Sequence, residues 1–575
     1  GGRVAGERFA RERVDLQKWN GHLARHEGNH PIEPLADKLF ANLFPRRAAG
    51  TVCSVRLIMS EPSHQYGRSG GNGLWLLGAT ALVVALLVFL MRDDSATLTE
   101  GGERELLVYC AAGVKKAVEE IAGKFEQELG VNVVLEYASS GVLANKLKTD
   151  RESGIDRADV YIPADYLYTE RAAADGLTAE SMKVASWKVV LAMKQDSTEP
   201  PLNVDAVLHQ KLSIVLCDPL AGVGRKTKKM LEQSGHWTGI DAAKAATFPT
   251  VTEAALAVKE NAGTDGAFIW DSVARQFGLK AVELPELEKS KANISVAVTA
   301  TTVRPMLALQ FARYLSAPTK GGEVFAKHQY RPIAGDAWDL QPKLRLDCGG
   351  VNREAVEKTI AEFRQREGCE IDIVYAGCGT LVGKMQTGEQ GLPDLFMTCD
   401  ASYLDMVQQK MGSPFGPDVR VASTRIVMLV AKGNPHGVET LEHLAKSGLR
   451  VGTTDPRAST LGAMSHHAIR ESGKFDAVEP NIVMMADTAH TLVQTMEAGQ
   501  QMDVALVYEA NVQHLKDRFD FVPLQPKYAI AVQNVAANKT TPYPRLAKRL
   551  MTRLASATSR RRFEQLGFQW EAGNE

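Results

Sequence analysis

Hydrophobic and polar positions between residues 106 and 141 follow two different periods. An apolar run at 106–110 predicts a strand, and VNVVLEY at 131–137 predicts a second strand. Between them, apolar side chains recur at i, i+4, i+7, i+8 and i+11, which is the spacing of one helix face. These residues are Val114, Val118, Ile121, Ala122 and Phe125. A Ser-Ser-Gly turn at 139–141 then opens another helix, so the stretch predicts a strand–helix–strand–helix unit.

The same unit occurs again later in the chain. Val351 lies 238 residues after Gly113, and Tyr508 lies 238 residues after Trp270. Phe125 and Phe363, and Tyr137 and Tyr375, share this offset, and ADVYIPAD at 158–165 corresponds to PDLFMTCD at 393–400. A constant offset with small local shifts predicts two tandem copies of one domain, at 104–335 and 343–571, joined by a short segment.

Strands and amphipathic helices alternate in each copy. In the first copy the strands are VVLEY, ADVYI, KVVLAM, LSIVL and GAFIW. This alternation is typical of the α/β class, with parallel sheets covered by helices on both faces. Copies of this length predict two lobes each, with a cleft between them where ligands bind at the carboxyl ends of the strands.

The N-terminal part of the chain differs from the rest. The 18 uncharged residues from Leu74 to Met91 predict a transmembrane helix, which needs about 17–25 apolar residues. No small-residue cleavage site follows, which favours an uncleaved anchor over a signal peptide. Arg68 before the run and Arg92 after it favour a cytoplasmic N-terminus. The two copies would then lie outside the cytoplasmic membrane.

Residues 1–73 form an N-terminal tail to which we assign no function. The first methionine of the sequence is Met59. Two interpretations remain open: translation begins at Met59, or residues 1–58 are a native tail.

Composition excludes some classes of function. The formal net charge is −1, whereas nucleic-acid-binding domains usually carry a basic surplus. The seven cysteines are too few for a disulfide scaffold, and they show no CxxC spacing.

Four loops of the first copy fall where a strand passes into a helix, and they are rich in Gly, Ala, Ser and Thr. They span residues 111–113, 139–141, 218–224 and 250–253. Small residues fit any tight turn, but four converging helix N-termini would also bind an anion through free N–H groups and the helix dipole. We expect an anion site there, with neutral donors sharing the charge.

Each copy resembles the molybdate/tungstate-type substrate-binding proteins of ABC transporters, which have the type II periplasmic-binding-protein fold. The resemblance lies in LVYCAAGV, YASSGVLANKL, ADVYIPAD, the Asp-Pro-to-Gly loop and YLSAPTKGGEVFAKHQY. It implies two bilobal domains, capture of a small oxyanion by cleft closure, delivery to an ABC permease, no cofactor and no catalysis.

Ligand positions follow from the same resemblance. In copy one they are Gly113, Ser140, Val223, Thr252 and Trp270, and in copy two Val351, Cys378, Leu461, Ala489 and Tyr508. The family has a hydroxyl residue where this chain has Gly113, and a tyrosine where it has Trp270. In copy two both hydroxyl positions are lost, so copy two is the weaker site, with a different anion or no ligand.

Two alternatives stay open. A sensor ectodomain, read by another protein, would bind ligand in the same way. In copy two, Cys348, Cys378 and Cys399 each end a predicted strand. They would form a thiolate site for a soft metal or thiophilic oxyanion, contain one disulfide, or simply fill tight turns. No HExxH zinc spacing and no GxSxG nucleophile elbow is present.

Overall fold

The computed structural model describes residues 104–155, 157–388, 390–499, 501–525 and 529–573. The N-terminal tail, Met59 and the predicted anchor from Leu74 to Met91 lie outside these ranges. Within them, none of the helices has the length and apolar composition that a bilayer span needs. The fold below is that of the described residues between 104 and 573.

The first lobe of copy one is a six-stranded sheet. Its strands run in the order β11 (Arg331–Pro332), β4 (Thr178–Trp187), β10 (Ala292–Thr299), β3 (Val160–Ile162), β1 (Glu105–Ala111) and β2 (Asn132–Ala138). Strand β1 pairs in parallel with β2 and β3, whereas β10 is antiparallel to β3 and β4. The helices are α2 (Lys115–Leu129), α3 (Ser140–Glu152), α4 (Tyr166–Ala174), α10 (Pro305–Ser316) and α11 (Glu323–Lys327).

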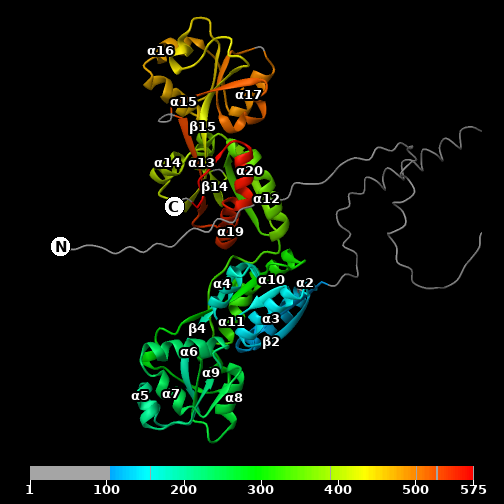
Figure 1. Cartoon of the computed structure of the whole chain (residues 1–575), viewed down its shortest axis with the longest axis vertical. Helices are drawn as coiled ribbons and strands as arrows, with labels where there is room; N and C mark the ends of the chain where they lie inside the picture. The colour runs from blue at the N-terminus through cyan, green and yellow to red at the C-terminus, as the bar shows by residue number, and fades with distance from the viewer. Residues whose placement is uncertain (1–103, 156, 389, 500, 526–528, 574–575) are drawn as a thin grey trace, which may run out of the picture. The chain divides into compact units, whose positions relative to one another are not determined.

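The second lobe of copy one is a separate five-stranded sheet. Its order is β7 (Ala246–Phe248), β6 (Ile214–Cys217), β8 (Gly266–Trp270), β5 (Val189–Met193) and β9 (Lys280–Val282). The helices are α5 (Val204–His209), α6 (Gly222–Gln233), α7 (Trp237–Ala243), α8 (Val251–Glu260) and α9 (Asp271–Gln276), and both lobes appear in blue to green in Figure 1. The chain passes between the lobes at Lys188, between β4 and β5, so copy one has the two lobes that the sequence predicts.

Copy two repeats this architecture with one difference. Strand β15 (Phe415–Ala431) is continuous where copy one has β4 and β5, so a single ten-stranded sheet runs through both lobes. The other strands of its main path are β13 (Glu370–Ala376), β12 (Lys343–Gly349), β14 (Leu395–Met397), β20 (Ile530–Asn538), β18 (Val504–Tyr508), β16 (Val451–Thr454) and β17 (Ile482–Ala486), with β19 (Phe519–Pro523) and β21 (Gln569–Trp570) on β15. The main helices are α12 (Arg353–Glu367), α13 (Cys378–Thr387), α14 (Ser402–Met411), α15 (Thr460–Glu471), α17 (Ala489–Glu497), α19 (Pro544–Leu554) and α20 (Ala557–Gln565).

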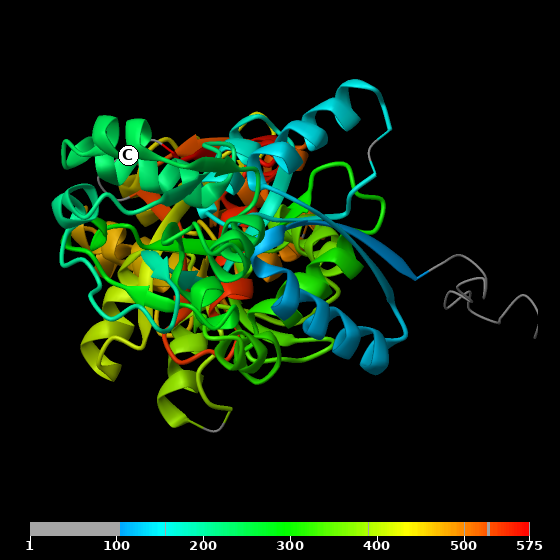
Figure 2. The same ribbon diagram turned by 90° about the horizontal axis from the view of Figure 1, so that it is seen from below.

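The predicted apolar helix face forms part of the core of copy one. Helix α2 lies alongside β1 and β2, all in blue in Figure 2. Val118, Ile121 and Phe125 are fully buried, and the Phe125 ring packs edge-on against Phe311 of α10 at 5.1 Å. The helix ends at Leu129 and is capped by Gly130, whose φ of 63° is the left-handed conformation that glycine adopts without strain. The sequence prediction for this helix is confirmed.

A buried ionic network connects the two copies. Glu367, at the end of α12, accepts hydrogen bonds from Arg549 of α19 at 2.6 and 2.9 Å. Its backbone carbonyl accepts one from Arg313 of α10 at 2.6 Å. Arg313 and Glu367 are almost completely buried. Removing one partner from such a network leaves an unpaired buried charge, so these contacts restrain the joint between the copies.

Candidate functional site

A small cavity of copy one lies where four helices begin. The helices are the 3-10 turn Ala112–Val114 with α2 behind it, α3, α6 and α8. The lining residues are Ala111, Ala112, Gly113, Ser139, Ser140, Ala164, Ala221, Gly222, Val223, Thr250, Val251 and Trp270. The cavity measures about 20 Å³. That exceeds the roughly 10–15 Å³ that one water needs and is far below the roughly 300–1,000 Å³ of a metabolite pocket.

Three of these helix N-termini have no side-chain cap. Ala111, Ser139 and Ala221 occupy the N-cap positions, and none of them accepts a hydrogen bond from the first turn with its side chain. Only Thr250 caps its helix, in a capping box with Glu253. Uncapped first turns leave backbone N–H groups without a partner. A cavity bounded by such groups and by positive helix ends suits an anion.

Ser140 is the best-placed side chain of the cavity. Its Oγ accepts a hydrogen bond from the Ala164 N–H at 2.9 Å, and its carbonyl accepts one from the Tyr161 hydroxyl at 2.7 Å. Ser140 is only 1% exposed. Because these contacts hold the oxygen as an acceptor, the hydroxyl proton is left to donate to a ligand.

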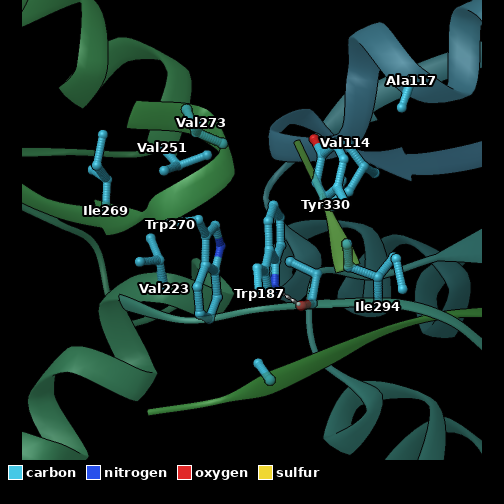
Figure 3. Packing of buried hydrophobic residues seen from close by; sticks show 14 of the residues in the cluster. Val114, Ala117, Trp187, Val223, Val251, Ile269, Trp270, Val273, Ile294 and Tyr330 are labelled. Atoms are coloured by element: carbon cyan, nitrogen blue, oxygen red, sulfur yellow. Dashed lines mark hydrogen bonds between the residues drawn. The ribbon is translucent and has the colours of Figure 1, made fainter. Parts of the chain in front are cut away.

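Two tryptophans fill the space beside Gly113. The rings of Trp187 and Trp270 stack with centroids 4.5 Å apart, and Figure 3 shows them face to face with Val223 and Val251 beside Trp270. A Cβ on Gly113 would lie 2.9 Å from Val251 Cγ1 and 3.1 Å from Trp187 Cη2. A serine at this position would therefore clash with Val251 and Trp187.

Four of the five predicted residues of copy one line the cavity. Gly113, Ser140, Val223 and Trp270 meet there, whereas Thr252 does not. The Thr252 hydroxyl instead lies 3.0 Å from that of Thr250. The structure adds Ser139, Gly222, Thr250 and Val251 to the lining. These four residues lie in the small-residue loops that the sequence predicts at the site, but the loop composition does not indicate which residue of each loop lines the cavity.

The two lobes of copy one are joined across the cavity. The Leu220 carbonyl, on the loop before α6, accepts hydrogen bonds from the Gly141 N–H at 3.0 Å and the Tyr168 hydroxyl at 3.1 Å. Asp165, at the start of α4, forms a close ion pair with Arg225 of α6. Because α3 and α4 of one lobe contact α6 and its preceding loop in the other lobe, the cleft of copy one is closed.

The corresponding cleft of copy two is much larger. Its cavity measures about 460 Å³ and is lined by Val351, Ala489 and Tyr508 among the predicted residues. Cys378 and Leu461 do not line it, and Cys399 and Ser459 do. The helix caps Thr250 and Thr488 correspond, so Ala489 is the counterpart of Val251 rather than of Thr252.

Two replacements account for the larger space. Val189 pairs with Trp270 in copy one, and Ile426 pairs with Tyr508 in copy two. Two residues before these positions, Trp187 at the end of β4 is therefore matched by Thr424 of the continuous strand β15, which has no ring. Since Gly462 corresponds to Gly224, Arg225 is matched by Ala463, and the ion pair across the cleft is lost.

The electrostatics of the second cleft also differ. It carries the carboxylates of Glu354, Glu357 and Asp487, and Arg353 is bonded to Glu357 at 2.7 Å. By contrast, every described residue that lines the first cavity is uncharged. The cleft therefore has three carboxylates and one guanidinium, which is already paired. This negative surplus opposes the entry of a dianion.

The three cysteines of copy two do not form the metal site considered above. Among the described residues, no group of three or more His, Cys, Asp or Glu side chains is arranged to hold a metal ion. Cys378 and Cys399 contact each other, whereas the Cys348 thiol lies 3.7 Å from the Gly349 carbonyl. Thiolate coordination of a metal by all three residues is therefore not favoured.

Comparison with known proteins agrees with this architecture. The family model described as bacterial extracellular solute-binding protein matches the chain twice, at residues 106–331 and 344–569. The chain belongs to this family. Its two matches are the two tandem periplasmic-binding-type domains of the structure.

Individual relatives match one domain's length of the chain. The molybdate-binding protein ModA of Escherichia coli K12 is 27% identical over 241 residues, which is 40% of this chain and 89% of the relative. ModA of Mycobacterium bovis is 25% identical over 244 residues, which is 41% of this chain and 90% of the relative. Among solved structures, the Azotobacter vinelandii periplasmic molybdate-binding protein is 21% identical with a TM-score of 0.33, covering 39% of this chain and 98% of its own.

Proposed function

We propose that this solute-binding protein captures a small tetrahedral oxyanion in its first cleft, with molybdate or tungstate as the ligand. The observation that carries the proposal is the neutral cavity of about 20 Å³ bounded by three uncapped helix N-termini and the Ser140 hydroxyl. The names of the relatives support molybdate over other oxyanions.

The physical argument concerns dehydration. An anion that enters a closed cleft loses its water and must recover equivalent hydrogen bonds from the protein. Hydrogen bonds to a charged group contribute roughly 1.5–3 kcal/mol each, so several N–H and O–H donors together offset that loss. Neutral donors suit this task because they add no fixed charge to be desolvated when the cleft is empty.

The chain's place in transport is a further part of the proposal. We expect an extracytoplasmic protein held at the membrane by Leu74–Met91, which delivers its ligand to an ABC-type permease. A tethered binding protein would act at a high effective concentration near its permease. The family description and the apolar run support this part. Such a protein binds and releases its ligand unchanged, so no catalytic role is proposed.

Calorimetry tests the proposal. The full-length chain would be titrated with molybdate, tungstate, sulfate and phosphate at one pH and ionic strength. We expect saturable binding of molybdate and tungstate at least 10-fold tighter than that of phosphate, whose protonated oxygen adds a donor that a donor-lined cavity cannot satisfy. Absence of binding by all four anions would overturn the proposal.

A further inference from the structure

Two cysteine thiols face each other beside the second cleft. The Sγ atoms of Cys378, the first residue of α13, and Cys399, two residues after β14, are 3.0 Å apart. The Cys399 N–H also donates to Cys378 Sγ at 3.0 Å. No other pair of cysteines in the described ranges makes such a sulfur–sulfur contact. The two sulfur atoms can therefore bond with a small movement of either side chain.

The pair occupies the positions of Ser140 and Ala164 in copy one. There, the Ala164 N–H donates to Ser140 Oγ at 2.9 Å, as the Cys399 N–H donates to Cys378 Sγ. Copy two thus keeps the backbone arrangement of an anion-binding serine but carries a thiol at both positions. A cysteine at one position alone would substitute for a hydroxyl, whereas cysteines at both allow a covalent bond.

The two thiols differ in access and acidity. Cys399 lines the cavity of about 460 Å³, and Cys378 lies behind it, fully buried. The Cys378 S–H donates toward Cys399, which lowers the pKa of the Cys399 thiol, while burial raises the pKa of Cys378. Cys399 is therefore placed to attack a molecule in the cleft, and Cys378 to attack Cys399 afterwards.

We propose that Cys378 and Cys399 form a redox-active dithiol, which a small-molecule disulfide entering the second cleft oxidises to a protein disulfide. The Cys399 thiolate attacks one sulfur of the reagent, forming a mixed disulfide and releasing a thiolate, which takes the proton of Cys378 and leaves as the first thiol. Deprotonated Cys378 then attacks Cys399 Sγ, forming the Cys378–Cys399 bond and releasing a second thiolate, which takes from solvent the proton that Cys399 had lost and leaves as the second thiol. Two protein thiols are oxidised and one reagent disulfide is reduced to two thiols, so atoms and electrons balance.

The charges of the cleft indicate which disulfide reacts. The carboxylates of Glu354, Glu357 and Asp487 line the cavity, together with Arg353 and His490. This surplus of carboxylates favours a neutral or cationic reagent over an anionic one such as oxidised glutathione. The proposal does not depend on oxyanion binding in the first cleft.

Thiol counting and peptide mapping test the proposal on the full-length chain. The reduced protein would be incubated under nitrogen with the neutral reagent 2-hydroxyethyl disulfide, quenched in acid, unfolded and alkylated. We expect the loss of two thiols relative to the reduced sample, and a disulfide joining tryptic peptides 367–384 and 385–410. Because the first peptide also contains Cys369, the mapping would be repeated on Cys369→Ser, where the link must persist.

Single variants separate the two roles. Cys378→Ser should accumulate a mixed disulfide on Cys399, and Cys399→Ser should lose both the internal bond and the adduct. Cys348→Ser serves as the matched control and should retain the internal bond. In the wild-type protein, either no loss of thiols or a disulfide that involves Cys348 or Cys369 would overturn the proposal. Neither outcome depends on whether a variant folds.

Discussion

Trp270 stacks on Trp187 with ring centroids 4.5 Å apart and ring planes within 9° of parallel. The Trp187 indole N–H donates to the Ala164 carbonyl at 3.0 Å, so the ring is fixed against the strand end that also positions Ser140. The stack reduces the first cavity to the size of a small ion. With Tyr508 and Thr424 in these positions, the second cleft is about 460 Å³. The duplicated domain therefore provides two sites of different size and charge.

Gly222→Ala should abolish oxyanion binding. A Cβ on Gly222 would lie 3.1 Å from Ala164 Cβ and 3.7 Å from Ser140 Oγ, within the cavity. We expect at least a 100-fold rise in the Kd for molybdate, measured by calorimetry. Gly123→Ala in α2 is the matched control, because its Cβ would meet no atom within 4 Å. It should leave the Kd unchanged and stabilise the helix by about 0.5–1 kcal/mol. Unaltered molybdate binding by Gly222→Ala would place the ligand elsewhere.

Ser140→Ala should weaken both ligand binding and the fold. Loss of a hydroxyl that donates to an anion costs roughly 1.5–3 kcal/mol, or a rise in Kd of about 10- to 150-fold. The Ala164 N–H also loses its acceptor, which should lower the free energy of unfolding by about 1–3 kcal/mol. Calorimetry and urea unfolding measure the two effects. The control is Ser153→Ala, at the exposed end of α3, which should change neither the Kd nor the free energy of unfolding. Equal Kd values for Ser140→Ala and wild type would show that Ser140 does not bind the ligand.

Arg225→Ala should accelerate ligand release. The ion pair of Arg225 with Asp165 joins the two lobes of copy one, and copy two has Ala463 in the equivalent position. We expect a rise in koff on the order of 10-fold, with a smaller change in kon, because charge-assisted hydrogen bonds contribute about 1.5–3 kcal/mol. Stopped-flow measurement of intrinsic tryptophan fluorescence, to which the stacked indoles contribute, follows ligand release. Lys228→Ala, on the same helix with an exposed partner, is the control. A koff equal to that of wild type would show that the pair does not hold the cleft closed.

The fold of the two copies can be predicted largely from the sequence pattern, whereas the size of each cleft cannot. The helix face around Phe125 and the repeat are visible because period and offset are local properties of the chain. The role of Trp187 cannot be predicted from the sequence, because Trp187 lies 83 residues before Trp270 and contacts it only through the pairing of β5 with β8. Similarly, which of Thr250 and Thr252 lines the cavity depends on where α8 begins. A shift of one residue rotates a helical side chain by about 100°. The size difference between the clefts arises from such tertiary contacts.

Acid should weaken the contact between α2 and the end of copy one. Glu120 of α2 accepts hydrogen bonds from Lys327 at 2.9 Å and lies 2.9 Å from His328 Nε2. Lys327 and His328 lower the pKa of the Glu120 carboxyl from 4.5 to about 2. Because the folded-state pKa is depressed, the stabilisation is complete above about pH 4.5 and is lost as the pH falls toward 2.

Unfolding of Glu120→Gln as a function of pH measures this contribution. Solvent screens the pair, so we expect a loss of no more than about 1 kcal/mol at pH 7, shrinking to zero near pH 2. Glu119 forms an exposed ion pair with Lys115 at 3.6 Å. Glu119→Gln should therefore lower the free energy of unfolding by less than Glu120→Gln at every pH. A deficit for Glu120→Gln that stays constant between pH 6 and pH 2 would contradict this assignment.

The central claim is that one oxyanion binds in the first cleft and none in the second. An X-ray structure of the full-length chain crystallised with tungstate tests this directly, because tungsten gives a strong anomalous signal. We predict one peak per chain, within hydrogen-bonding distance of Ser140 Oγ and of N–H groups at the start of α6. A peak only in the second cleft, or equal peaks in both clefts, would contradict the account.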